Sequence, residues 1–134
     1  MPKTCQKRQL GDTYDGKQGF SYFEGIARET TGAQGICMHM LRIPPGGRAK
    51  AHQHDAHETA IYVIEGEAIM YWGEQLEHLM ETQPGDLVYI PAGVPHLPVN
   101  TGTTEAVAII ARTDPHEQES VHLRPDLEAF APPT

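Results

Sequence analysis

The sequence predicts an all-β protein, a sandwich or small barrel built from short strands. Its 13 glycines and 11 prolines are spread along 134 residues, a pattern that favours many short strands joined by tight turns over long helices. Short apolar runs recur between these turn signals. No segment keeps a helical period over about 12 residues, apart from a single turn at residues 125–130. Chain length allows one domain with a core of its own.

The strands are expected wherever apolar or alternating residues lie between turn residues. A first strand with a following turn is expected in residues 21–30. Residues 35–43 are an apolar strand that "PPGGR" ends sharply, because proline cannot continue a ladder and Gly-Gly favours a turn. Residues 51–71 hold two strands with a bend at Glu65-Gly66. The remaining strand material falls in residues 72–86 (a turn and a short strand), 86–91, 97–102 and 104–112.

The chain divides into an N-terminal arm (1–20), a barrel (21–113) and a C-terminal tail (114–134). Eighteen acids against ten basic residues give a net charge of −8, which argues against nucleic acid as a partner. Cys5 and Cys37 form no C-x-x-C pair and no disulfide framework. The N-terminus lacks a secretory h-region, and no apolar run is long enough to cross a membrane. We therefore expect a cytoplasmic protein that binds neither nucleic acid nor membrane.

Three histidines and a glutamate in residues 51–67 suggest a metal site. Residues two apart on a strand share a face, so His52 and His54 point the same way, and Glu58 has the same parity. Two imidazoles and a carboxylate on one face make a chelate for a divalent transition metal. An H-x-H pair alone is weak evidence, because surface loops often contain one. A further histidine, His96, follows a proline-braced turn at the end of another strand.

The two segments together resemble the two signature motifs of the cupin superfamily. The first motif reads Gly-x5-His-x-His-x3-Glu and the second Gly-x5-Pro-x-Gly-x2-His-x3-Asn. In this chain the motif positions are Gly46, His52, His54 and Glu58, followed by Gly85, Pro91, Gly93, His96 and Asn100. The resemblance covers roughly residues 35 to 112.

This resemblance implies a jelly-roll barrel, the double-stranded β-helix, with one divalent transition metal per chain. Its ligands would be His52, His54, Glu58 and His96. Manganese or iron is favoured for this mixed nitrogen and oxygen set, and nickel, zinc or copper also suits it. Cupins of this kind commonly pair, so a homodimer is expected, with residues 35–43 and the N-terminal arm at the interface.

One spacing departs from the family pattern. Six residues usually separate the motif glutamate from the next glycine, whereas seven separate Glu58 from Gly66 here. A β-bulge could absorb the extra residue and keep Glu58 pointing inward. Alternatively, Glu58 is displaced and His57 takes its place as a ligand. Glu58 is the preferred choice.

The functional hypothesis is a metal-dependent enzyme that acts on a small oxygenated molecule by redox-neutral isomerase or lyase chemistry. His57 is its candidate catalytic acid or base, because it lies beside Glu58 and has a reference pKa of about 6.5. Two alternatives stay open: an oxygen-dependent cupin dioxygenase, and a non-catalytic module that binds a metal or ligand. His39 is expected in the core, and Asn100 is expected to stabilise a turn.

Overall fold

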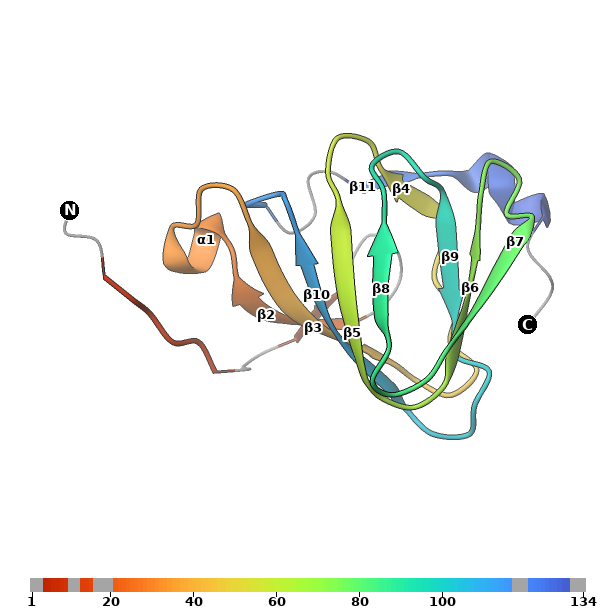
Figure 1. The fold of residues 1–134 in the computed structure, drawn as a ribbon, viewed down its shortest axis with the longest axis horizontal. Helices are drawn as coiled ribbons and strands as arrows, with labels where there is room; N and C mark the ends of the chain where they lie inside the picture. Colours follow the sequence, from red (N-terminus) through yellow and green to blue (C-terminus); the bar gives the residue numbers. More distant parts are fainter. Residues whose placement is uncertain (1–3, 10–12, 16–20, 117–120, 131–134) are drawn as a thin grey trace.

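In the computed structural model, which describes residues 4–9, 13–15, 21–116 and 121–130, two antiparallel sheets face each other across a shared interior (Figure 1). The six-stranded sheet has the order β1-β2-β3-β10-β5-β8. Its strands are β1 (Thr13–Asp15), β2 (Ser21–Ile26), β3 (Cys37–Ile43), β10 (Ala106–Arg112), β5 (Thr59–Glu65) and β8 (Leu87–Ile90). The five-stranded sheet has the order β11-β4-β9-β6-β7. Its strands are β11 (Val121–Leu123), β4 (His52–His54), β9 (His96–Val99), β6 (Ala68–Trp72) and β7 (His78–Thr82).

The all-β prediction is confirmed. Only two short helical segments are present among the described residues, α1 (Arg28–Thr31) and the 3-10 helix η1 (Pro125–Phe130). The second is the single turn expected at residues 125–130. The bend expected at Glu65-Gly66 separates β5 from β6, and Gly66 has a φ of +81°, a conformation that favours glycine. A Cβ at Gly66 would lie 2.6 Å from the carbonyl oxygen of Glu105, so the close approach also requires glycine.

The turn role of Asn100 is confirmed as well. Its side-chain amide donates hydrogen bonds to the carbonyl oxygens of Ile43 (3.0 Å) and Thr104 (2.8 Å), and its carbonyl oxygen accepts one from the Gly102 N–H (2.8 Å). The residue is fully buried. A single side chain thus satisfies three backbone groups of two loops, as buried polar groups require.

Apolar side chains between the two sheets form the core. One cluster joins β3 and β10 through Leu41, Ile43 and Ile110, and another contains Met70, Val88 and Ile90. A third lies on the outer face of the five-stranded sheet, where Leu127 of η1 packs with Leu97 and Val99. The end of the chain therefore covers a sheet face that would otherwise be exposed.

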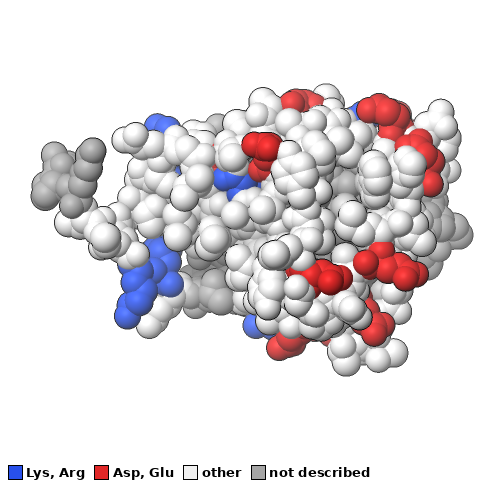
Figure 2. Space-filling view, viewed as in Figure 1, with Lys and Arg blue, Asp and Glu red and all other residues white. Residues whose placement is uncertain are grey.

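The surface reflects the net negative charge. Figure 2 shows acidic side chains mainly over the right-hand half of this face, while Lys and Arg lie mostly toward the left. No described helix is both long and apolar enough to cross a membrane.

Candidate metal centre

Two strands of the five-stranded sheet bring three histidines together. His52 and His54 share one face of β4, because they are two residues apart. His96, the first residue of β9, is the register partner of His52. One nitrogen of each ring lies within 4.8 Å of one nitrogen of the other two. All three rings are buried, with exposures of 2%, 2% and 4%.

Backbone carbonyls orient two of these rings. The Nδ1 of His52 lies 2.7 Å from the carbonyl oxygen of Lys50, and the Nδ1 of His96 lies 3.0 Å from that of Val94. A carbonyl oxygen can only accept, so each Nδ1 carries the proton and each Nε2 keeps its lone pair. This is the tautomer that a metal ligand needs, with the hydrogen bond fixing the ring.

Burial keeps the three imidazoles neutral. It lowers the pKa of His54 to about 2 and that of His96 to about 4, and it holds the pKa of His52 well below its usual value of 6.5. Loss of hydration penalises the charged form most, and the mutual repulsion of the rings adds to it. Histidine binds a metal only when it is neutral, so no proton competes with a metal near neutral pH.

The structure does not bring Glu58 into this group. Its side chain is exposed, and its carboxylate accepts a hydrogen bond from the hydroxyl of Tyr89 at 2.6 Å. Alternation along β5 runs unbroken from Thr59, which is buried, to Val63. A residue immediately before a buried strand position points outward, which places Glu58 on the outer face.

β5 does contain an irregularity, but it lies at the end of the strand away from Glu58. Val107 pairs with Glu65 while Ala108 pairs with Val63, so the register shifts there. The irregularity therefore comes too late to turn Glu58 inward. Counting the family's six residues back from Gly66 leads instead to Thr59, which is 3% exposed.

His57 lies in the loop between β4 and β5 and is half-buried. Its charge is one of the smaller contributions, after burial, to the lowered pKa of His54, so the two residues are close. His57 does not belong to the group of three metal-binding candidates. It thus lies beside the site, without the contacts of a ligand.

Two further polar side chains reach the same end of the barrel. His39 on β3 is 1% exposed, as expected of a core histidine, and Arg112 at the end of β10 is 4% exposed. After burial, the charge of Arg112 is the next cause that lowers the pKa values of His39 and His54, and it also contributes at His96. The guanidinium therefore lies inside the barrel near the histidines. Sequence reasoning missed it, because Val107, Ile109 and Ala111 make both faces of β10 apolar.

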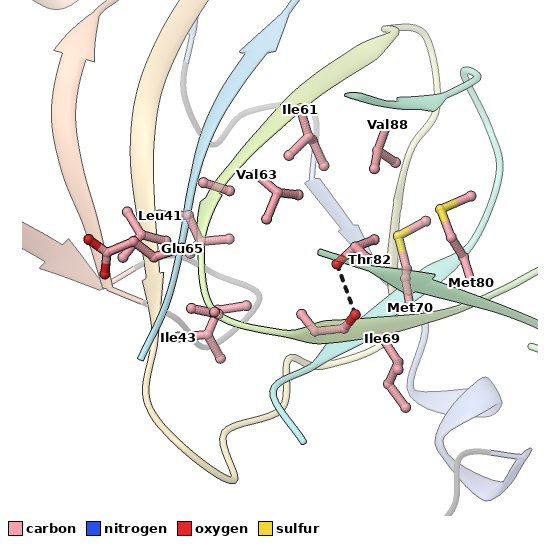
Figure 3. A pocket seen from close by; sticks show the side chains of 15 residues that line it. Leu41, Ile43, Ile61, Val63, Glu65, Ile69, Met70, Met80, Thr82 and Val88 are labelled. Atoms are coloured by element: carbon pink, nitrogen blue, oxygen red, sulfur yellow. Dashed lines mark hydrogen bonds between the residues drawn. The ribbon is translucent and has the colours of Figure 1, made fainter. Parts of the chain in front are cut away.

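An apolar cavity of about 70 Å³ occupies the opposite end of the interior. Figure 3 shows Ile61, Val63 and Val88 directed toward the same space as Met70 and Met80. The hydroxyl of Thr82 lies at its edge and donates to the carbonyl oxygen of Ala68 at 2.8 Å. Glu65 is the one charged residue of the lining, which is otherwise almost entirely apolar and suits a hydrocarbon group.

The chain's C-terminal segment holds the strand that carries two of the histidines. β11 pairs with β4 through Val121 and Leu123. The side chain of Arg124 donates to Gln53 at 2.6 Å, and the carboxylate of Glu128 accepts from the Ala51 N–H at 2.8 Å. β4 would otherwise be an edge strand of three residues, so these contacts fix the position of His52 and His54.

The three histidines fit a divalent transition metal. Neutral imidazoles, here with the tautomer fixed at His52 and His96, are ligands for manganese, iron, nickel, copper and zinc alike. Three protein ligands are typical of catalytic metal sites, whereas structural sites have four. The geometry can therefore hold one ion per chain.

Comparison with known proteins agrees with this architecture. A family model described as a cupin domain matches residues 39–112, more than half of the chain. Auxin-binding protein ABP19b of Prunus persica is 29% identical over 83 residues, which cover 60% of this chain and 40% of that protein. The chain thus spans well under half the length of the curated relatives it matches.

Solved structures show the same fold. The polyketide cyclase RemF of Streptomyces resistomycificus aligns with a TM-score of 0.69 at 23% identity, over 92% of this chain and 85% of that one. An oxalate decarboxylase of Lactobacillus farciminis, solved as a formate complex, aligns with a TM-score of 0.72 at 21% identity, over 92% of this chain and 36% of that one. At such identities the likeness concerns the fold alone.

Proposed function

The chain belongs to the cupin family, and from that premise we propose that it is a metal-dependent enzyme for a small oxygenated molecule, acting by redox-neutral isomerase or lyase chemistry. One observation carries the proposal: three buried, neutral imidazoles converge inside the barrel from His52, His54 and His96. Buried polar groups, a buried arginine among them, cost stability. A site that served only to stabilise the fold would therefore not be expected to contain them.

Manganese or iron is the proposed metal, with nickel, zinc or copper as other occupants of an imidazole set. When bound, the ion would stabilise negative charge on an oxygen of the substrate. The protein's own part is to hold the imidazoles neutral and oriented, through the carbonyl oxygens of Lys50 and Val94. The burial of the three rings keeps bulk water away from them.

His57 is proposed to move the proton that redox-neutral chemistry requires. It is half-buried beside His54, and histidine is the side chain that most often serves as a general acid or base. Glu58 does not take this role, because its carboxylate lies on the outer face with Tyr89.

The test is elemental analysis of protein purified without added metal, followed by turnover assays on sugars, hydroxy-carbonyls and carboxylates with and without oxygen. One metal per chain and turnover that persists without oxygen support the proposal. In that case His57→Gln should keep the metal and lose on the order of 100-fold in turnover. Turnover that stops without oxygen and returns in air would show the dioxygenase alternative instead. Protein purified without any bound metal would favour the non-catalytic binding module.

The outer face of the six-stranded sheet is proposed to pair with a second copy of the chain. Tyr62 and Leu87 are register partners there, and their side chains are 47% and 82% exposed, with Tyr89 beside them at 58%. An exposed apolar patch of this kind marks an interaction site. Light scattering should give a dimer mass that Leu87→Glu reduces to the monomer; a monomeric wild type contradicts the proposal.

A further inference from the structure

A buried arginine beside the three histidines indicates what the site binds. Arg112 is 4% exposed, and its Nε and Nη1 are buried with no hydrogen-bond partner among the described residues. A guanidinium keeps its charge at every physiological pH. A buried charge without a partner costs several kcal/mol of stability. A protein therefore keeps such a charge where a ligand or an ordered water supplies the missing hydrogen bonds.

Within the described residues, Arg112 has no acidic partner in an ion pair. Asp114 is the only buried acidic side chain among the described residues, and no ion pair within 4.0 Å joins it to Arg112. One of its carboxylate oxygens accepts from the His116 N–H at 2.9 Å. A divalent metal on the histidines would add positive charge to the same space, which increases the need for an anion.

Thr59 lies directly opposite Arg112. The two residues are register partners in β5 and β10, and side chains of such partners lie on the same face about 5 Å apart. The hydroxyl of Thr59 is buried and also has no hydrogen-bond partner among the described residues. A guanidinium and a hydroxyl therefore face the interior side by side, both able to donate.

We propose that Arg112 and Thr59 bind the carboxylate of a small organic acid, held beside the three histidines. The proposal rests on the proposed function and names its substrate class. Guanidinium and carboxylate match in shape and charge and form paired hydrogen bonds. A phosphate would match as well, but it carries more charge, and Arg112 is the only buried arginine or lysine among the described residues.

The rest of the acid is expected to be apolar. The inner positions of β5 run from Thr59 through Ile61 to Val63, and Ile61 and Val63 line the cavity at the other end. Two residues of a strand span about 7 Å. A carboxylate held at Thr59 therefore directs an attached hydrocarbon group along this apolar row.

Binding of three matched probes to metal-free protein tests the proposal by calorimetry. Benzoate carries the carboxylate, benzamide lacks the charge, and phenyl phosphate carries the competing anion. We expect benzoate to bind on the order of tenfold or more tightly than benzamide, the worth of a charged hydrogen bond. Arg112→Met should abolish this preference, Arg112→Lys should keep part of it, and Thr59→Val should weaken benzoate binding several-fold. Arg42→Met, at an exposed arginine paired with Glu105, is the control and should change nothing.

Equal binding of benzoate and benzamide by the wild type would overturn the proposal, as would unchanged benzoate binding in Arg112→Met. Tighter binding of phenyl phosphate would overturn the choice of carboxylate. Should Arg112→Met fail to fold, Arg112→Lys and Thr59→Val carry the same test. Metal content separates this proposal from the proposed function: Arg112→Met keeps the metal, whereas His52→Ala loses the metal and keeps the preference for benzoate.

Discussion

The two ends of the barrel interior differ in chemistry although the same strands line both. β3 (Cys37–Ile43) has His39 toward one end of the interior and Ile43 at the other, and β10 (Ala106–Arg112) has Arg112 and Ala106 at the same two ends. At one end the inner positions are histidine, threonine and arginine, and at the other they are aliphatic or methionine. The apolar end gains stability from burial, whereas each polar group costs stability unless it is satisfied. Substitutions at the two ends should therefore affect different properties.

The largest expected effect is loss of the metal from the polar end. His52→Ala or His96→Ala should lower bound metal from about one ion per chain to well below it, because each removes one of three ligands, while circular dichroism still shows a folded barrel. Elemental analysis gives the measurement. His122→Ala, at an exposed histidine, and Glu58→Gln should both retain the metal. A full metal complement in the His52→Ala/His96→Ala double variant would disprove the site.

The next effect is acid sensitivity of the metal-free protein. His39, His54 and His96 have folded-state pKa values of about 3, 2 and 4, all lowered chiefly by burial, against about 6.5 when unfolded. Below pH 6.5 the unfolded chain takes up protons that the folded chain does not, so stability falls as the pH is lowered, for each histidine until its folded-state pKa is reached. Each histidine contributes about 1.4 kcal/mol per pH unit.

Urea unfolding of chelator-treated protein between pH 7.5 and 5 measures this dependence. His96→Gln should flatten it, because a glutamine does not titrate. A stability that stays constant from pH 7.5 to 5 would show that these histidines are hydrated in solution.

At the apolar end the expected effect is on stability alone. Ile43 is 5% exposed and packs against Leu41 and Ala106. Ile43→Ala should lower the free energy of unfolding by about 2–5 kcal/mol, with the metal content unchanged. A variant that loses metal in proportion to its lost stability would mean that the two ends do not act separately.

The smallest effect concerns the outer surface. The hydroxyl of Tyr89 donates to Glu58 in full contact with solvent, so Tyr89→Phe should change stability by less than about 0.5 kcal/mol and leave the metal in place. Measurable metal loss in this variant would return Glu58 to the ligand set.

Much of the fold was predictable, because alternation and turn residues are local signals. The strands at residues 37–43, 87–90 and 106–112 lie within the expected segments, and the bend at Gly66 is where the glycine indicated. Three of the four expected ligands also converge. The H-x-H spacing puts His52 and His54 on one face of a strand, and His96 follows a turn that brings it beside them.

The remainder depends on pairing between distant strands. Whether Glu58 points inward depends on where β5 departs from regular pairing, and its register with β10 shifts only between Val63 and Glu65. The inward position of Arg112 could not be predicted from the sequence for a related reason. Both faces of β10 are apolar in sequence, so alternation could not tell which face the last residue joins until its neighbours Thr59 and Cys37 were known.

The pairing of β4 with β11 has a consequence for the order of folding. β4 lies between β9, which it meets through a single register pair, and β11. Of the strands described, β11 is the last that the ribosome makes, and closing such a long loop is slow compared with forming a hairpin. During synthesis the segment with His52 and His54 therefore gains its second neighbouring strand only after most of the barrel has been synthesised. Capture of the proposed metal would then be one of the final steps of maturation, so metal supply should matter after translation and not during it.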